Sequence, residues 1–360
     1  MLLDFLVQMI IISVRNNKQY IAMKSLRNLS LMALLILINT SSFSAEVNVY
    51  SARQEALIKP LLDEFTKKTD IKVNLVTGKG DALLTRLVNE GRNSPADVLL
   101  TVDAGRLYRA QESGVLQPIK DKKINSLIPK NLRSIDNMWF GLSIRARVIM
   151  FASDRVSESE LESYESLSDE KWKGRICIRS SSNIYNQSLV AGMIAQNGLE
   201  KTEAWLQKFT DNFARKPTGG DRDQIKSVAA GECDIAVSNS YYLGHMLNSS
   251  DLKQRAAAEQ VTLFWPNQKD RGTHINISGA GVTKHSKNIE NAKTLIAFLA
   301  NDESQRWYAD KNNEFPIRDN VEVSPTLDAW GPFIADQMNV SQLGKFNADA
   351  IKAMDRAGWK

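Results

Sequence analysis

Strand-like apolar runs alternate with amphipathic helical segments along the chain, and this order limits the possible folds more than any other feature. Residues 54–67 carry apolar side chains at helical spacing and stand between two strand-like runs, as in a βαβ unit. The pattern then repeats, which predicts an α/β protein with largely parallel sheets. Strands are expected at 47–50, 71–75, 97–100, 139–151, 175–178, 234–238 and 279–282, and helices at 54–67, 81–89, 104–112, 187–195, 203–209, 222–230 and 288–299.

The length of 360 residues favours two domains, because single hydrophobic cores stop growing at about 250–300 residues. The long strand at 139–151 is interpreted as a crossing into a second α/β lobe, and the glycine-rich run at 279–282 as the return. We expect an N-terminal lobe of residues 45–143 and 276–320 and a C-terminal lobe of residues 144–275 and 321–360. The cleft between such lobes is the usual ligand site of α/β proteins.

The first 44 residues have the pattern of a secretory signal peptide. A basic start at 23–27 precedes an apolar run at 31–38 and small residues at 42–44. The apolar run is shorter than the roughly 20 residues of a membrane span, which disfavours a retained anchor. We predict translation from Met23 and a mature chain that begins near Ala45.

The exported chain has nearly balanced charge. Lysine plus arginine outnumber aspartate plus glutamate by 46 to 41 in the whole sequence, and by 42 to 40 once the first 44 residues are removed. Nucleic-acid binding needs a concentrated basic surface, so we expect no nucleic-acid partner.

Two cysteines, Cys177 and Cys233, are candidates for a disulfide in an oxidising compartment. Both lie in apolar strand-like runs, where a free cysteine packs as a small hydrophobic residue. The sequence leaves both states open and favours buried free thiols.

Enzyme and metal motifs based on histidine, cysteine or serine are absent. His245, His274 and His285 show no HExxH spacing, and neither CxxC nor GxSxG occurs. Residues 78–80 form a bare GxG that is more typical of a turn than of a phosphate loop. A secreted enzyme with a tyrosine nucleophile is a distant rival, because no base is recognisable beside the tyrosines. We expect no enzyme.

Tyrosines stand at the ends of several predicted strands. Tyr241 and Tyr242 directly follow the strand at 234–238, Tyr185 lies just beyond another strand, and Tyr50 closes the first. An isolated tyrosine pair usually has one ring in the core and one at the surface. Several phenols at strand ends that face one cleft instead suit a hard, highly charged cation such as ferric iron. Three phenolates would neutralise its charge and leave coordination positions for an anion.

Two arginines have positions that suit this anion. Arg53 follows the first strand at a predicted helix start, and Arg145 lies in the predicted crossing between lobes. An exposed, salt-bridged side chain is the simpler interpretation of either residue alone. Together they suggest a guanidinium clamp on a small oxyanion such as carbonate.

Seven segments carry a family resemblance, at 49–54, 94–98, 142–148, 172–176, 239–242, 278–282 and 313–317. Their order, together with the tyrosine pair, resembles the bacterial periplasmic ferric-ion-binding proteins, the receptors of iron ABC transporters. The resemblance covers essentially all of the mature chain. It implies a two-lobed periplasmic-binding-protein fold (type II-like) with a hinged cleft. It also implies a monomeric periplasmic receptor that delivers iron(III) to an inner-membrane permease and its ATPase.

The resemblance assigns roles to individual tyrosines. Tyr241 and Tyr242 match the family's paired iron ligands, and Tyr185 matches a third tyrosine ligand of some subgroups. Gln54 and Glu55 stand where other subgroups have histidine and tyrosine ligands, so those ligands are missing here. An acidic ligand of one subgroup falls at Val102, beside Asp103, and is not carried over.

This pattern is similar to the subgroup that uses three tyrosines and a synergistic carbonate or bicarbonate. Arg53 and Arg145 then hold the anion, and Tyr50, Gln54 and Asn239 are supporting candidates around the site. An alternative keeps the fold and changes the ligand to a small anion or organic solute bound by Arg53 and Arg145, with the tyrosines as walls of its site.

Overall fold

The computed structural model describes residues 7–9, 15 and 45–360. The predicted signal sequence at 23–44, the start at Met23 and most of the preceding segment lie outside these residues. Within the described part of the chain, no helix is both long enough and apolar enough to cross a membrane. Residues 45–360 form one structural unit, which is described below.

Eight strands of this unit form a mixed sheet in the order β2-β1-β3-β8-β4-β6-β5, and β7 pairs with β4. The strands are β1 (Glu46–Ser51), β2 (Lys72–Thr77), β3 (Val98–Val102), β4 (Phe140–Phe151), β5 (Ile176–Cys177), β6 (Ile235–Asn239), β7 (Thr262–Phe264) and β8 (Ile275–Val282). The helices are α2 (Lys59–Thr69), α3 (Gly80–Glu90), α4 (Ala104–Glu112), α5 (Lys122–Leu127), α6 (Ile184–Asn197), α7 (Leu199–Asp211), α8 (Asp221–Ala229), α9 (Ser240–Leu247), α10 (Leu252–Ala258), α11 (Ile289–Leu299), α12 (Asp302–Asn312), α13 (Pro325–Asp328), α14 (Ser341–Lys345) and α15 (Asn347–Arg356).

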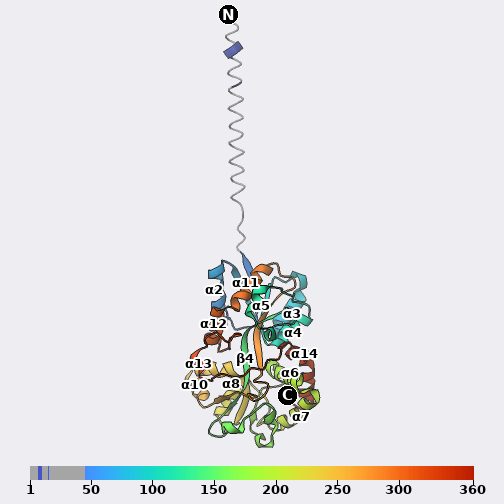
Figure 1. Ribbon diagram of the computed structural model, residues 1–360, viewed down its shortest axis with the longest axis vertical. Coiled ribbons are helices and arrows are strands. Elements are labelled where there is room, and N and C mark those ends of the chain that lie inside the picture. Colours follow the sequence, from blue (N-terminus) through green and yellow to red (C-terminus); the bar gives the residue numbers. More distant parts are fainter. Residues whose placement is uncertain (1–6, 10–14, 16–44) are drawn as a thin grey trace. The chain divides into compact units, whose positions relative to one another are not determined.

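The long strands β4 and β8 connect the two halves of the sheet. The first part of β4 pairs with β8, and its second part pairs with β6 and β7. The far end of β8 pairs with β3. Helices α2, α3, α4, α5, α11 and α12 surround one half, and α6, α7, α8 and α10 surround the other (Figure 1). The α/β class is thus confirmed, whereas the residue boundaries of the lobes stay a prediction.

The expectation of largely parallel sheets was wrong. Strand β1 is parallel to β2 and β3, and β5 is parallel to β6. Every pair that involves β4 or β8 is antiparallel. The two crossing strands run against their neighbours and so make the sheet mixed.

The helix expected at 54–67 begins later than predicted. A 3₁₀ turn, Glu55–Leu57, comes first, and α2 starts only at Lys59. Pro60 explains this start, because proline lacks the N–H that a helix interior requires and is favoured in the first turn. Arg53 therefore does not stand at an α-helix N-terminus, and the helix dipole gives no support to its predicted role.

A disulfide joins Cys177 and Cys233, whose Cα atoms are 5.8 Å apart. The favoured expectation of free thiols was wrong. Cys177 lies in β5 and Cys233 two residues before β6, and the parallel pairing of these strands brings the two cysteines together. The bond therefore holds β5, which precedes Tyr185 in the chain, next to the start of β6, which precedes Tyr241.

Candidate functional site

A cavity of about 220 Å³ collects side chains from both halves of the sheet. Its walls come from the turn after β1, the end of β3, the middle of β4, the first turns of α6 and α8, the first two turns of α9, and the loop after α12. The lining residues are Ala52, Arg53, Gln54, Leu57, Val102, Arg145, Tyr185, Arg222, Tyr241, Tyr242, His245 and Glu314.

The structure brings six of the eight predicted site residues into this cavity, namely Arg53, Gln54, Arg145, Tyr185, Tyr241 and Tyr242. It does not bring Tyr50 there. The Tyr50 hydroxyl donates to the Glu90 carboxylate at 2.9 and 3.0 Å, and the Arg86 guanidinium lies 4.7 Å from the ring centroid. Asn239 lies behind the cavity, where its Nδ2 donates to the Tyr241 hydroxyl at 3.4 Å.

Two helix starts position the three phenols. Strand β6 ends at Asn239, and α9 begins at the next residue, so Tyr241 and Tyr242 lie in its first turn. Their ring centroids are 4.3 Å apart. Tyr185 is the second residue of α6, where the Asn183 side chain caps the helix by accepting from the Tyr185 backbone N–H at 3.1 Å. Short connections after β5 and β6 thus direct three phenols to one place.

Arg145 lies among these phenols. Its guanidinium donates to the Tyr185 hydroxyl at 3.3 Å and to the Tyr241 hydroxyl. Its Cζ lies 4.8 and 4.5 Å from the two ring centroids. A protein cation therefore contacts two oxygens that are predicted metal ligands.

The three phenols have different pKa values for identifiable reasons. Burial raises the pKa of Tyr185, but the charge and hydrogen bond of Arg145 outweigh burial and place this pKa below the usual 10. Burial dominates at Tyr241 and raises its pKa despite Arg145. Burial, followed by the neighbouring Tyr185, raises the pKa of Tyr242. Tyr185 is the phenol most easily converted to phenolate.

Glu314 is a cavity residue that sequence reasoning missed. This buried carboxylate accepts from Arg53 Nη1 at 3.0 Å and lies 3.5 Å from Arg145 Nε. Burial raises its pKa, but the two guanidiniums outweigh burial and hold the pKa below the usual range. Both predicted anion-binding arginines therefore already share one protein carboxylate.

Backbone pairing explains the place of Glu314. The chain turns at Asn313, which has a φ of +50° and ends α12. Phe315 then pairs with Ile144 of β4, which places Glu314 beside Arg145. Side chains of a strand alternate between its two faces, so Ser143, Arg145 and Arg147 share one face of β4. The polar alternation in this otherwise apolar strand is the signal that marks its cleft side.

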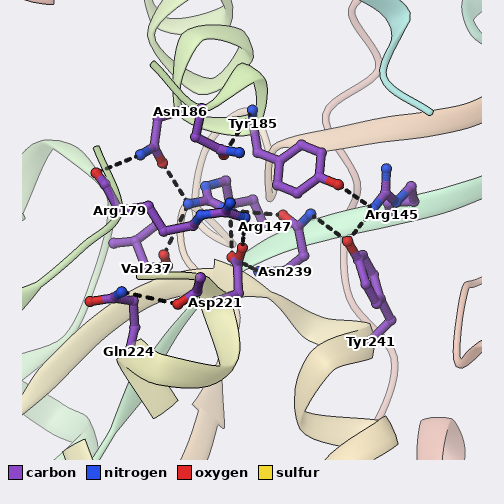
Figure 2. Close-up of polar contacts among 12 residues, drawn as sticks. Arg145, Arg147, Arg179, Tyr185, Asn186, Asp221, Gln224, Val237, Asn239 and Tyr241 are labelled. Carbon is purple, nitrogen blue, oxygen red and sulfur yellow. Dashed lines mark hydrogen bonds and ion pairs between the residues drawn. The ribbon is translucent and has the colours of Figure 1, made fainter. Parts of the chain in front are cut away.

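A buried polar network supports the tyrosines from behind (Figure 2). Arg147 forms an ion pair with Asp221 at 3.1 Å and also donates to the side-chain oxygens of Asn186 and Asn239. Asn186 follows Tyr185, and Asn239 precedes α9. The backbone segments that carry Tyr185 and Tyr241 are therefore held by a single guanidinium.

The acidic residues next to the predicted site lie elsewhere. Asp103 is buried and accepts from Ser188 Oγ at 2.7 Å and from Asn276 Nδ2 at 2.9 Å, so it does not line the cavity. Glu55 is exposed and does not line it either. Among the described residues, no group of three or more histidine, cysteine, aspartate or glutamate side chains could hold a metal ion. The oxygen donors of this cavity are mainly phenols.

Two α/β halves joined by long shared strands, with a polar cavity lined by both, define a binding receptor for a small solute. Comparison with known proteins identifies the family of receptors to which the chain belongs. The chain belongs to the bacterial extracellular solute-binding protein family, whose family model matches residues 61–333.

Iron-binding and iron-uptake proteins are similar to this chain over most of its length. Iron uptake protein A1 of Synechocystis is 47% identical over 322 residues, 89% of each chain. The major ferric iron-binding protein of Neisseria meningitidis is 28% identical over 318 residues, 88% of this chain and 94% of the relative. A solved structure of Trichodesmium IdiA (FutA) with iron and citrate has a TM-score of 0.86 at 52% identity and covers 88% of this chain and 100% of that chain. These likenesses confirm the predicted two-lobed periplasmic-binding fold.

Proposed function

We propose that this chain is a periplasmic iron(III)-binding receptor that delivers ferric iron to an ABC-type importer. One observation carries the proposal: Tyr185, Tyr241 and Tyr242 line a single cavity. Phenolate oxygens suit a hard trivalent cation. Two of the relatives, an iron uptake protein and a ferric iron-binding protein, support the same ligand. They do not favour the alternative of a receptor for an organic solute.

In this proposal iron replaces protons on the phenols. A bound metal stabilises the phenolate and removes a proton that the free phenol keeps at neutral pH. Arg145 now donates to two of the phenol oxygens, so its guanidinium must adjust when iron occupies them. The rest of the proposal is that the chain acts as a monomer in the periplasm, has no enzymatic activity, and passes iron to a permease and its ATPase; membership of the solute-binding protein family supports the transport role.

The visible spectrum of the purified mature protein tests the metal assignment. Ferric iron bound by phenolates is expected to give a charge-transfer band in the visible region, together with about one iron per chain by metal analysis. A protein that stays colourless with ferric iron and retains none after gel filtration would refute the proposed function. Zinc serves as the control cation, because it has no d-electron preference and gives no such band.

We further propose that a carbonate or bicarbonate ion binds together with the iron and is held by Arg53 and Arg145. Three phenolates leave an octahedral ion short of ligands, and arginine can hold an oxyanion through two parallel donors. Both arginines line the cavity, and each is also paired with Glu314. The anion must therefore share these guanidiniums with the carboxylate.

Replacing Arg53 is expected to expose the role of the anion. Arg53→Ala should weaken ferric iron binding about tenfold in bicarbonate buffer, about what the loss of one charged hydrogen-bonding partner costs. Removing bicarbonate should weaken the parent but scarcely affect this variant. Arg53→Lys should restore part of the loss, because it keeps the charge without the planar pair of donors. Iron affinity that is indifferent to both bicarbonate and Arg53 would show that another ligand completes the site.

A further inference from the structure

The Arg145 guanidinium takes a place that a ferric ion would need. A single nitrogen, Nη2, donates to the hydroxyls of both Tyr185 and Tyr241, so the guanidinium lies between the two phenols (Figure 2). An ion bound to both oxygens would also lie between them, and a positive charge only a few ångströms away repels it. Loading the cavity with iron therefore requires the guanidinium to leave the phenols.

The Glu314 carboxylate offers a second partner for this guanidinium. Its Oε2 accepts from Arg53 Nη1 at 3.0 Å, from Ser278 Oγ at 3.1 Å and from Ser143 Oγ. Its Oε1 accepts no hydrogen bond from any residue that the structure describes, and it lies 3.5 Å from Arg145 Nε. That Nε is itself buried without a hydrogen-bond partner. A free acceptor and a free donor thus lie next to each other.

The surroundings favour a shift of Arg145 toward Glu314 over a shift into water. Both side chains are only 4% exposed, and a buried charge that loses its partner is costly. Glu314 is fixed by the three donors on its Oε2 and by the pairing of Phe315 with Ile144, so the guanidinium is the group that moves. A short movement converts the 3.5 Å contact into a charged hydrogen bond. The Nη groups of Arg145 then stay available for the proposed anion.

We propose that Glu314 is the positioning residue that takes up Arg145 when iron enters the cavity. The Arg145 guanidinium shifts from the two phenols to Glu314 Oε1 on loading and returns to the phenols on release. This inference rests on the proposed function, because iron is the ion that displaces the guanidinium. Glu314 acts through Arg145 and does not bind the iron itself. The returning guanidinium competes with the ion for the phenol oxygens and so assists release.

The rate of iron release tests this role. The parent and the variants are loaded with ferric iron in bicarbonate buffer and challenged with EDTA at concentrations where the rate no longer depends on EDTA, and the visible band is followed. Glu314→Gln should release iron about tenfold faster, because a neutral amide holds the shifted guanidinium less tightly than a carboxylate does. Glu314→Asp keeps the charge but draws the carboxylate back by one methylene. Its release rate should lie between those of the parent and Glu314→Gln.

Double variants separate an action through Arg145 from an action through Arg53, the other guanidinium that pairs with Glu314. In an Arg145→Gln background, Glu314→Gln should change the release rate by less than about twofold. In an Arg53→Gln background, the same change should still speed release about tenfold. The opposite pattern, equal acceleration in both backgrounds, or a single Glu314→Gln variant that releases iron at the parental rate would overturn the inference.

Glu55→Gln is the matched control, because Glu55 is exposed and lies outside the cavity. It removes the same charge and should leave the release rate unchanged. Urea unfolding of the iron-free proteins identifies any variant with a folding defect. If Glu314→Gln does not fold, Glu314→Asp takes its place in the same two backgrounds, where the same contrast is expected. A parent that binds no ferric iron would instead refute the proposed function.

Discussion

Replacing both Tyr241 and Tyr242 with phenylalanine is expected to lower the affinity for ferric iron by more than about a thousandfold and to abolish the visible band. Changing a residue that merely supports a metal ligand already costs about 10- to 100-fold in affinity. This double variant removes two of the three proposed direct ligands and the two negative charges that they would supply to balance the ion. Each substitution deletes a single oxygen, and both rings keep their packing at 4.3 Å centroid separation. Equilibrium competition against citrate measures the loss.

Tyr50→Phe is the matched control for that experiment. Tyr50 is also a buried tyrosine, but its hydroxyl contacts Glu90 and not the cavity. The control should lose about 1 kcal/mol of unfolding free energy with its hydrogen bond and keep its iron affinity. Urea unfolding of the apo proteins then separates a folding defect from a missing ligand. The assignment of the tyrosines as ligands is wrong if the double variant competes for iron as well as the parent does.

The tyrosine cluster could be predicted from the sequence because only local features were needed: the positions of the tyrosines relative to strand ends, and the edge of the sheet at which those ends lie. Each of Tyr185 and Tyr241 follows a short strand-like run, and side chains beyond the ends of neighbouring strands gather at one edge of a sheet. The same rule failed at Tyr50, which is still inside β1 and whose side chain therefore takes its direction from the strand. A difference of one or two residues in the end of a strand thus decides whether a phenol reaches the cavity.

The partners of the arginines could not be predicted in this way. Glu314 reaches Arg145 only because Phe315 pairs with Ile144, a contact between residues 171 positions apart. Arg222 is one of several polar residues on an amphipathic helix, and helical spacing gives no reason to separate it from an exposed charge. The disulfide also depends on a strand pairing that the spacing of Cys177 and Cys233 does not reveal. The position of Glu314 and the disulfide therefore depend on pairing between distant parts of the chain, which local sequence patterns do not reveal.

The buried network around Arg147 could be predicted only in part. Alternation along β4 already places Arg145 and Arg147 on one face. It cannot tell that Asp221, at the start of α8, neutralises Arg147 in the interior. A buried arginine requires such a partner, because an unpaired buried charge costs several kcal/mol. The sequence thus implied that an acid was needed but did not identify it.

Iron binding is expected to release about two to three protons per ion near pH 7, and the affinity should therefore fall steeply as the pH falls. The apo phenols of Tyr241 and Tyr242 are protonated at this pH, because burial keeps their pKa values above the usual 10. Tyr185 has a lowered pKa through Arg145 and so contributes at most one proton. Protons and iron compete for the same oxygens, so acid favours the apo form and higher pH favours the loaded form.

Proton release can be counted directly in a weakly buffered solution with a pH indicator, with ferric nitrilotriacetate as the iron source. Tyr185→Phe provides the internal comparison, since the nitrilotriacetate released from iron takes up the same number of protons with each protein. If all three phenols bind as phenolates, this variant should release up to one proton fewer than the parent and bind iron more weakly. The difference should shrink as the pH rises toward the pKa of Tyr185, because the parent then has less of that proton to lose. A parent that releases no protons on binding iron, or an affinity that is constant between about pH 5 and 8, would mean that these tyrosines do not coordinate iron as phenolates.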